Sequence, residues 1–494
     1  MTASIAAIDL GSNSFHLLVA RPMNKGIQVI DQDKEMVRLA SGLQADRSID
    51  SETKERALVC LSRFGQHIRH ISPDAIRIVG TNTLRAARKS NKFIKQAQLL
   101  LGHEIEIISG IEEARLIYLG VAHSIASNNG RRMVVDIGGG STEIIVGERF
   151  EPLRMESLYM GCVSMTQRYF SDGNVSEKRV AKARLTAMLE LEPHINLFRE
   201  LGWTDSIGAS GTARAVEYVA RANGWGNGEI NAAALANIIQ SYIQAGSLVQ
   251  TKLEGLKAER APVFLGGAII LAAIFEAFEI QTMMVSSGAL REGLLYDLIG
   301  RSQKKSTRQQ TVVDLGKRYK LDGEQARRVE NTAVALWKQV APDTPLLNID
   351  CEKMLGWAAR LHELGLSIAH SQHHKHAGYI LRHADLFGFS WQEQQVLAAI
   401  VQSHRRSFPE DIFNRLPERW RSKAVKLSLF LRLAVILHRS RSQATVSTPI
   451  CQLTEKSIKL IFADKWLQQH PLTRVDLEEE ARRLSKRDIE LSFE

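Results

Sequence analysis

The stretch MVVDIGGGSTEIIV, residues 133–146, reads as an apolar strand, a glycine turn and a second apolar strand. A similar stretch, IAAIDLGSNSFHLLVA, occupies residues 5–20, with Asp9 and Asp136 in equivalent places before the turn. Short runs rich in Val and Ile around a glycine turn are typical of a β-hairpin. We interpret the two stretches as a weak internal repeat, with one copy in each of two α/β lobes.

Both turns have the composition of a phosphate-binding loop. Glycine removes the Cβ that would keep an oxyanion away from backbone N–H groups, and it permits positive φ. Residues 138–142 add two hydroxyls to three glycines, and Asp136 and Glu143 flank them. Two carboxylates beside a phosphate suit Mg²⁺, which prefers hard oxygen ligands. The alternative is a pair of ordinary hairpins in which Asp9 and Asp136 only help to form the turns.

Other segments are also candidates to bind phosphate. Residues 208–212 precede a helical pattern, where backbone amides attract anions, although Ser210 could equally be a simple N-cap. Residues 286–293 form a similar segment. Arg38 and Arg85 follow strand-like stretches and could clamp phosphates, but lone arginines are more often solvated surface charge.

Residues 109–115, SGIEEAR, follow a strand and open a helix. Ser109 and Glu112 fit an S-x-x-E capping box, which gives Glu112 a structural role. Glu113 lies about 100° further round the helix, on the apolar face with Ile117. A carboxylate on a packed face is costly unless it has a partner or a task. Glu113 is therefore either a general base for water or one half of an ion pair with an arginine.

The bulk properties indicate a globular protein of several domains with an anionic partner. The 494 residues are 44% hydrophobic and 24% charged, and the formal net charge is +10. Positive charge alone does not choose among nucleic acid, anionic lipid and polyphosphate. Four widely spaced cysteines predict reduced thiols in the cytoplasm, because no zinc or disulfide spacing is present. No secretory signal pattern occurs, and the apolar run 263–275 is shorter than the ~18 residues of a membrane span, so any membrane contact would be peripheral.

The sequence pattern changes near residue 301. Residues 301–306 form a polar linker, and apolar residues with helical periodicity dominate after it. The apolar faces of these helices favour a homodimer. The predicted domains are lobe I (1–125), lobe II (126–302), a helical domain (303–440) and a small mixed C-terminal element (441–494).

Three motifs resemble the exopolyphosphatase / guanosine pentaphosphate phosphohydrolase family, namely residues 9–16, 109–117 and 136–143. Further matching segments extend the resemblance over essentially the whole chain. The resemblance implies two actin-like lobes of the acetate and sugar kinase/Hsp70/actin type, followed by an all-α domain similar to the HD phosphohydrolase bundle. It also implies a site between the lobes that hydrolyses a terminal phosphoanhydride.

The resemblance assigns roles to individual residues. Glu113 is implied as the catalytic base, and Asp136 and Glu143 as the acids that hold Mg²⁺, with Asp9 holding a metal-bound water. The implied substrate-binding residues are Asn13, Ser14, Arg38, Arg85, Gly138, Gly139, Gly140, Ser141 and Ser210.

Within the family, Gly140 and the helical C-terminal region favour an exopolyphosphatase that releases orthophosphate from inorganic polyphosphate. The alternative is a phosphohydrolase that converts pppGpp to ppGpp. A kinase of the same superfold and a non-catalytic polyanion-binding regulator are more distant rivals.

Two clusters in the helical region invite further hypotheses. Seven histidines crowd residues 362–404, but Glu363 stands where the HD bundle has a metal-binding Asp, so a metal-free domain is favoured. Basic residues crowd positions 415–441, and we predict that they guide polyphosphate toward the site. Nucleic acid would use the same charge, but no recognised nucleic-acid module accompanies it. The predicted basic track consists of Arg415, Arg419, Arg421, Lys423, Lys426, Arg432, Arg439 and Arg441.

Overall fold

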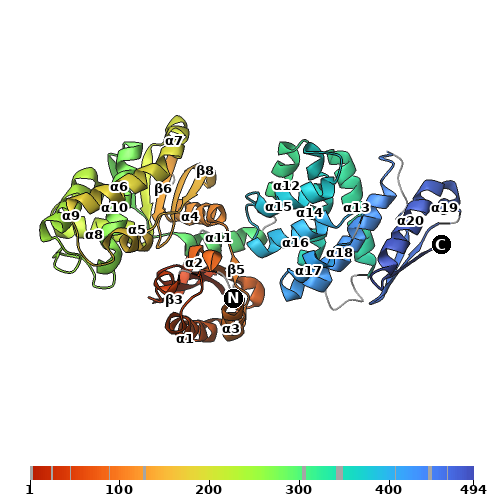
Figure 1. Ribbon diagram of the computed structural model, residues 1–494, viewed down its shortest axis with the longest axis horizontal. Helices are drawn as coiled ribbons and strands as arrows, with labels where there is room; N and C mark the ends of the chain where they lie inside the picture. The colour runs from red at the N-terminus through yellow and green to blue at the C-terminus, as the bar shows by residue number, and fades with distance from the viewer. Residues whose placement is uncertain are drawn as a thin grey trace. The chain divides into compact units, whose positions relative to one another are not determined.

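A computed structural model describes residues 4–494 except residues 24–25, 45, 88–89, 126–129, 303–306, 341–348, 407, 443–447 and 464. The chain divides into two compact units, residues 1–305 and 306–494 (Figure 1). Most of the predicted linker 301–306, and the predicted domain starts at 126 and 303, lie outside the described residues.

Lobe I is built on a five-stranded sheet of order β3-β2-β1-β4-β5, in which β1 pairs antiparallel with β2 and parallel with β4. Helix α1 (Ser51–Ile68) begins at Asp50, whose carboxylate accepts the Thr53 amide. Its apolar face, with Leu61 and Phe64, is buried in the core of the lobe. The remaining elements are β1 (Ile5–Leu10), β2 (Phe15–Pro22), β3 (Ile27–Glu35), β4 (Ile76–Gly80), α2 (Asn82–Ala86), α3 (Asn91–Leu101) and β5 (Glu106–Ile107).

Lobe II repeats this arrangement in a six-stranded sheet of order β10-β11-β9-β6-β7-β8. Asp136 of β6 pairs with Glu143 of β7, just as Asp9 of β1 pairs with His16 of β2. The two hairpins are thus equivalent in register as well as in sequence. The elements of lobe II are β6 (Arg131–Ile137), β7 (Thr142–Glu148), β8 (Glu151–Leu158), α5 (Cys162–Phe170), α6 (Glu177–Leu191), α7 (Ile195–Leu201), β9 (Asp205–Ala209), α8 (Ser210–Ala222), β10 (Ile230–Asn231), α9 (Ala232–Ala245), α10 (Ala261–Phe278) and β11 (Thr282–Val285).

Helix α10 contains the longest apolar run of the sequence. Over the described residues it is the one helix long and apolar enough to cross a membrane, but 72% of it is buried inside the protein. Its side chains, including Leu265 and Ile269, belong to the core of lobe II. The apolar run of α10 is therefore packed as part of the hydrophobic core of lobe II.

Two helices cross between the lobes (Figure 1). Helix α4 (Gly110–Ser124) follows the sheet of lobe I but packs on β7 and β8 of lobe II, whereas α11 (Leu290–Ser302) follows β11 but packs on β1 and β2. Glycines permit the close approach of α4 and α11. A Cβ built at Gly120 would lie 2.0 Å from the carbonyl oxygen of Ala289, and one at Gly293 would lie 1.8 Å from that of Leu116.

We expect Gly293→Ala to lower the free energy of unfolding of unit 1 by about 1–3 kcal/mol, because the added methyl group overlaps a backbone oxygen that cannot move alone. Urea denaturation, together with hydrogen exchange of the amides in α4 and α11, would measure the loss of unfolding free energy. Gly300→Ala is the matched control in the same helix, because a Cβ there meets nothing within 4 Å. That change should stabilise the helix slightly, and an equal loss in both variants would contradict the packing argument.

Unit 2 consists of helices and a small sheet that share one hydrophobic core. Trp337 and Phe430 from the helices and Leu460 from the sheet all belong to it. The sheet has the order β12-β13-β14. The elements are α12 (Thr307–Arg318), α13 (Gly323–Val340), α14 (Ile349–Leu361), α15 (His373–His383), α16 (Trp391–Gln402), α17 (Glu410–Asn414), α18 (Glu418–Leu437), β12 (Ile450–Leu453), β13 (Ser457–Ile461), α19 (Trp466–Gln469), α20 (Pro471–Ser485) and β14 (Glu490–Phe493).

Candidate active site

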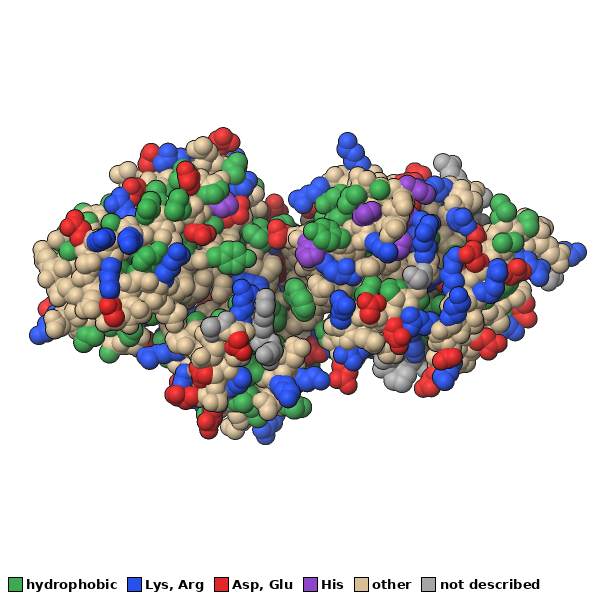
Figure 2. All heavy atoms as spheres, in the orientation of Figure 1, with side chains coloured by type: hydrophobic (Ala, Val, Ile, Leu, Met, Phe, Trp, Pro, Cys, Tyr) green, Lys and Arg blue, Asp and Glu red, His purple; other side chains and the backbone are tan. Residues whose placement is uncertain are grey.

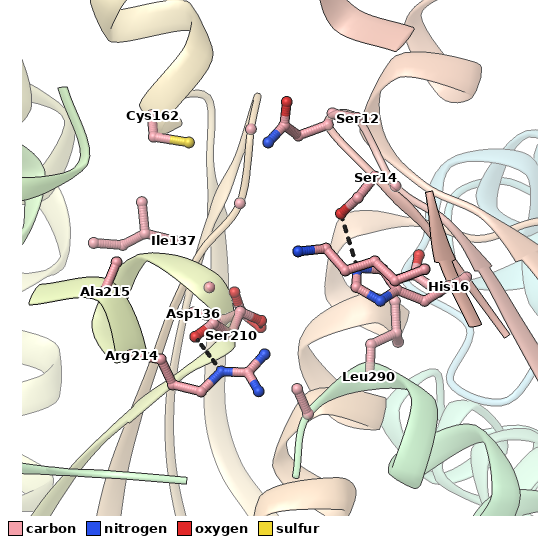
Figure 3. A pocket seen from close by; sticks show the side chains of 18 of the residues that line it. Ser12, Ser14, His16, Asp136, Ile137, Cys162, Ser210, Arg214, Ala215 and Leu290 are labelled. Atoms are coloured by element: carbon pink, nitrogen blue, oxygen red, sulfur yellow. Dashed lines mark hydrogen bonds between the residues drawn. The ribbon is translucent and has the colours of Figure 1, made fainter. Parts of the chain in front are cut away.

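A cavity of about 770 Å³ is lined by residues of both lobes of unit 1. Figure 3 shows Asp136, Ser210 and Arg214 on one side of it and Ser14 and His16 on the other. The structure brings most of the predicted site residues to its wall. These are Asp9, Asn13, Ser14, Glu113, Asp136, Gly138, Gly139, Ser141, Glu143 and Ser210.

The tips of the two glycine hairpins contact each other at this cavity. A Cβ built at Gly139 would lie 3.0 Å from Cβ of Ser12 and 3.6 Å from the backbone nitrogen of Asn13. The turn of the second hairpin is closed by the Gly138 amide, which donates to the carbonyl of Ser141 at 2.9 Å. The Nδ2 atom of Asn13 is buried without a hydrogen-bond partner. The hairpins therefore bring an unpaired side-chain donor and two glycine turns together between the lobes, an arrangement that suits an oxyanion.

Four buried carboxylates line the pocket. Burial, followed by repulsion from Glu113, raises the pKa of Asp9 to about 8. Burial also raises the pKa of Glu113 to about 7, against the opposing effect of the Arg85 guanidinium, and that of Asp136 to about 6. The pKa of Glu143 is raised well above its ordinary value by burial and by repulsion from Glu113. Acids this close resist simultaneous ionisation unless a cation joins them.

The donor set of the pocket fits a hard divalent cation. Asp9 Oδ1 is buried without a hydrogen-bond partner, and the acids around it offer oxygen ligands only. Among the residues that the structure describes, no three His, Cys, Asp or Glu side chains are already arranged to share a metal ion. Mg²⁺ suits such a site, because it is usually held by one or two carboxylates, waters and substrate phosphates. Asp136 and Glu143, with Asp9, are the side chains available to hold it.

Glu113 stands at the first turn of α4 and faces the pocket. Arg85 Nη1 lies 3.4 Å from Glu113 Oε2 and donates to the carbonyl of Ile108 at 2.6 Å. The predicted ion pair with an arginine is thus present, and it leaves Glu113 at the wall of the cavity, where the role of general base stays a prediction. The capping box is only half formed. Ser109 Oγ accepts the Glu112 amide at 3.1 Å, but the Glu112 side chain turns elsewhere.

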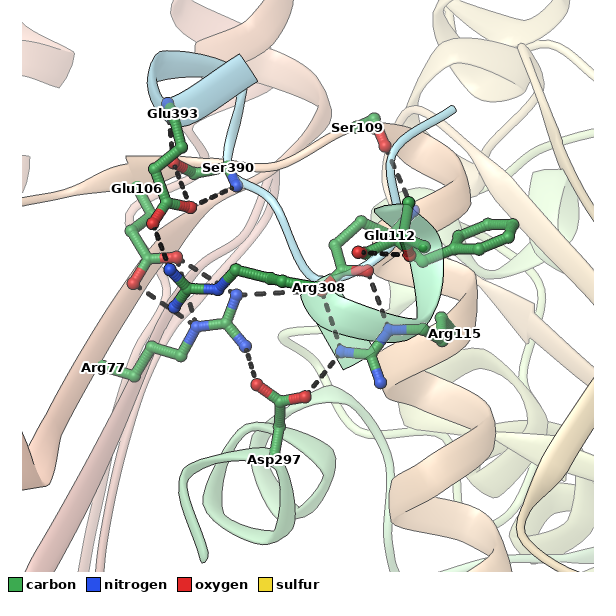
Figure 4. Close-up of polar contacts among 11 residues, drawn as sticks. Arg77, Glu106, Ser109, Glu112, Arg115, Asp297, Arg308, Ser390 and Glu393 are labelled. Carbon is green, nitrogen blue, oxygen red and sulfur yellow. Dashed lines mark hydrogen bonds and ion pairs between the residues drawn. The ribbon is translucent and has the colours of Figure 1, made fainter. Parts of the chain in front are cut away.

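Glu112 belongs instead to a buried ion-pair network (Figure 4). Arg115 Nε donates to Glu112 Oε2 at 2.8 Å, and Arg115 Nη2 donates to Asp297 Oδ1 at 2.7 Å. Arg77 Nη1 donates to the other oxygen of Asp297 at 2.8 Å. The network joins β4 to α4 and α11, so it holds the turn of α4 that carries Glu113.

Ser210 is held in a strained backbone conformation at the start of α8. Its φ of 62° lies in the left-handed region, which costs a non-glycine residue of order 1 kcal/mol or more. In this position its hydroxyl donates to Asp136 Oδ2. The next residue, Gly211, leaves room for Arg260, because a Cβ there would lie 1.7 Å from Arg260 Nη2.

Sequence reasoning gave no role to the arginines that line the pocket. Arg214, Arg260 and Arg291 all do so, and burial, followed by repulsion from Arg291 and Arg260, lowers the pKa of Arg214. Their convergence creates a strongly positive wall that suits a polyanion. The spacing of Arg214 four residues after Ser210 on one helix was a usable signal. No comparable signal marks Arg260, which lies against the backbone of Gly211 at the pocket.

His16 was also missed as a pocket residue. Its Nε2 atom lies 2.8 Å from Ser14 Oγ (Figure 3). Burial, followed by repulsion from Arg291, lowers the pKa of His16 to about 2. A neutral imidazole therefore contacts the Ser14 hydroxyl, and its register opposite Asp9 was the signal that could have found it.

Three predicted substrate-binding residues do not line the pocket. Arg38 lies beyond the hairpin and contributes its backbone amide, which donates to the carbonyl of Asn13 at 2.8 Å. Arg85 contacts Glu113, which lines the pocket, but Arg85 is not itself part of the lining. Gly140 faces Asn82, whose Oδ1 atom would lie 2.6 Å from a Cβ at that position. Close packing against lobe I thus accounts for a glycine at residue 140.

Four histidines of unit 2 form a buried cluster, namely His362, His373, His374 and His404. The ring centroids of His362 and His373 lie 5.3 and 5.4 Å from that of His404. His362 Nδ1 and His404 Nδ1 lie 2.7 and 2.6 Å from backbone carbonyls of the helices that precede them, α14 and α16. Burial lowers the pKa of His362, His373 and His374 to about 4 and that of His404 well below its ordinary value. The metal-free interpretation of the cluster stays a prediction.

These lowered pKa values predict acid destabilisation of unit 2. The folded cluster binds fewer protons than the unfolded chain, where histidine titrates near 6.5. The free energy of unfolding should therefore be highest above pH 6.5 and fall toward pH 4, by up to about 1.4 kcal/mol per pH unit for each histidine. Urea denaturation between pH 7.5 and 4.5 would measure the slope. The variant His374→Leu removes an imidazole whose Nδ1 is buried without a partner, and an unchanged slope would contradict the argument.

The predicted basic track is wrong at Arg432, which is 1% exposed and forms a buried ion pair with Glu480. Arg439 pairs with Asp476, and Arg441 pairs with Asp322 at 3.1 Å. Figure 2 shows basic and acidic side chains interspersed on the visible face of unit 2. Much of the charge in residues 415–441 is therefore compensated locally.

Comparisons with known proteins agree with this architecture. Residues 18–302 match the model of the Ppx/GppA phosphatase family, and residues 307–481 match its domain III. The chain is 39% identical over 481 residues to a protein of Aeromonas hydrophila named guanosine-5'-triphosphate,3'-diphosphate pyrophosphatase, covering 97% of each chain. A protein of the same name from Pseudoalteromonas atlantica is 38% identical, covering 96% of this chain and 94% of the relative.

Solved structures show the same fold. An exopolyphosphatase from Cytophaga hutchinsonii superposes with a TM-score of 0.55 at 23% identity, over 60% of this chain and 98% of that one. A Ppx/GppA family member from Aquifex aeolicus gives 0.51 at 22% identity, over 60% and 98%. The predicted actin-like lobes with a C-terminal helical domain are confirmed, as is the prediction of a hydrolase acting on phosphoanhydride bonds. This chain belongs to the Ppx/GppA phosphatase family.

Proposed function

We propose that this protein hydrolyses the terminal 5′ phosphoanhydride of pppGpp, releasing orthophosphate and ppGpp. The observation that carries the proposal is the identity of 38–39% over nearly the whole chain to relatives named for that substrate. The pocket supports it, because a wall of arginines and two glycine hairpins suits a 5′-triphosphate. This reverses the sequence-based preference for polyphosphate.

The chain's own residues account for most of the chemistry. Donors of the Gly138–Ser141 turn bind oxygens of the terminal phosphoryl group, and Arg214 and Arg291 compensate its charge. Glu113, oriented by Arg85, accepts a proton from a water molecule as the water oxygen forms a bond to the terminal phosphorus. The bond from that phosphorus to the bridging oxygen breaks, and ppGpp leaves with the electron pair. Mg²⁺ held by Asp136 and Glu143, with Asp9, would supply neutralisation of phosphate charge.

Inorganic polyphosphate is the second candidate substrate, because the positive wall would bind any chain of phosphates. The argument for it from Gly140 is weakened, since packing against Asn82 already requires a small residue there. A homodimer and a cytoplasmic location stay predictions.

The decisive assay is orthophosphate release from pppGpp and from long-chain polyphosphate, each with Mg²⁺ and with EDTA. We expect a higher kcat/KM for pppGpp, with ppGpp as the second product, and loss of turnover in EDTA. Hydrolysis of polyphosphate without hydrolysis of pppGpp would establish the second candidate. If hydrolysis continued in EDTA, the hypothesis that Asp136 and Glu143 hold a catalytic Mg²⁺ would be rejected.

A further inference from the structure

One face of α8 leads away from the buried carboxylates. Ser210, Arg214 and Tyr218 are spaced four residues apart, so they share a face of the helix. All three line the pocket, together with Glu217. Since α8 rises about 1.5 Å per residue, Tyr218 lies on the order of 12 Å beyond Ser210, which contacts Asp136. The cavity thus extends from the carboxylates to an aromatic side chain.

Arg221 holds Tyr218 and Glu217 side by side. Its guanidinium carbon lies 5.5 Å from the centroid of the Tyr218 ring, and its Nε atom lies 3.5 Å from Glu217 Oε1. Tyr218 is nevertheless 46% exposed, and the Glu217 side chain is 15% exposed. A ring and a carboxylate are therefore presented together at the cavity.

The loop before α10 closes against the same helix. Gly255 has a φ of +80°, and a Cβ built on it would lie 3.0 Å from Cδ1 of Tyr218. Asn223 Nδ2 donates to the carbonyl of Glu254 at 3.0 Å, which ties the loop to the end of α8. The loop carries Lys257 to the lining of the cavity. Glycine at residue 255 is what lets this segment lie so close to the ring.

Tyr218 and Glu217, at this end of the pocket, do not favour the binding of a chain of phosphates. It has no face to stack on an aromatic ring, and the Glu217 carboxylate repels it. A guanine base matches both groups. Its π-face stacks on aromatic side chains, and its Watson–Crick edge carries N–H donors, whereas a carboxylate only accepts.

We propose that Tyr218 and Glu217 form a guanine subsite, in which the ring stacks on the base and the carboxylate accepts hydrogen bonds from its N1–H and 2-amino groups. This inference rests on the proposed function, because it takes the substrate to be a guanosine polyphosphate. Arg221 is a positioning residue that orients both side chains. The subsite determines specificity for the nucleotide and lies apart from the atoms that react.

Calorimetric titration with GDP and with IDP tests the subsite directly, because IDP lacks only the 2-amino group of guanine. The wild-type protein should bind GDP about tenfold or more tightly than IDP, as expected for loss of a good base contact. In Glu217→Gln the ratio of the two dissociation constants should fall toward one. Tyr218→Ala should instead weaken both ligands alike, by about tenfold or more. Glu254→Gln, an exposed acid on the neighbouring loop, is the matched control and should keep the wild-type ratio.

Equal binding of GDP and IDP by the wild-type protein, or an unchanged preference in Glu217→Gln, would overturn the proposal. So would an equal fall of kcat/KM for tripolyphosphate and for pppGpp in that variant, since it would place Glu217 in phosphate binding. The two hypotheses fail separately. Preference for GDP without hydrolysis of pppGpp would reject the proposed function and retain the subsite.

Discussion

Replacing Glu113 with glutamine should lower kcat for orthophosphate release by about 10²–10⁴-fold. The variant keeps the size of the side chain and its contact with Arg85, but it can no longer accept a proton from water. The substrate-binding wall, with Arg214 and Arg291, is untouched. The loss should therefore appear in kcat, with little change in affinity.

The measurement is steady-state hydrolysis of pppGpp, together with calorimetric binding of ppGpp to the same variant. Binding close to that of the wild type would show that the pocket is intact. The control is Ser157→Ala, which removes the hydroxyl that donates to Glu143 Oε1 at 2.8 Å and leaves Glu113 in place. Ser157→Ala should lower kcat far less than Glu113→Gln does. Turnover near the wild-type rate in Glu113→Gln would reject the assignment of the base.

Replacing Asp297 with alanine should lower the free energy of unfolding of unit 1 by about 3–5 kcal/mol. Asp297 bridges Arg77 and Arg115 at 2.8 and 2.7 Å, and Arg77 is 1% exposed. Removing the carboxylate takes one shared counter-ion from two buried guanidinium groups and leaves them to share Glu112. Burial makes this costly, because water cannot replace the lost partner.

Urea denaturation, with hydrogen exchange in α4 and α11 to resolve unit 1 from unit 2, would measure the loss. Glu52→Ala is the control, since it breaks an ion pair with Arg56 in which the Glu52 side chain is 86% exposed, and such pairs contribute little. A loss in Asp297→Ala no larger than in Glu52→Ala would show that the network does not hold the crossing helices together.

Local sequence patterns were enough to predict the parts of the site that depend on local structure. The hairpins around Asp9 and Asp136 were predictable because apolar alternation and glycine turns act over a few residues. Glu113 was separable from Glu112 because helical periodicity turns adjacent residues by about 100°. These rules need no knowledge of distant segments.

Contacts between distant parts of the chain could be identified in the folded protein but not in the sequence. Arg77 and Asp297 are 220 positions apart, and no local pattern pairs them. Arg260 lies against the backbone of Gly211 at the pocket. Arg432 was predicted to belong to the basic surface track, but it forms a buried ion pair with Glu480. Charged side chains look alike in a sequence whether they are solvated or buried. Their partners are chosen by the packing of whole elements, here most of all by two helices that cross between the lobes.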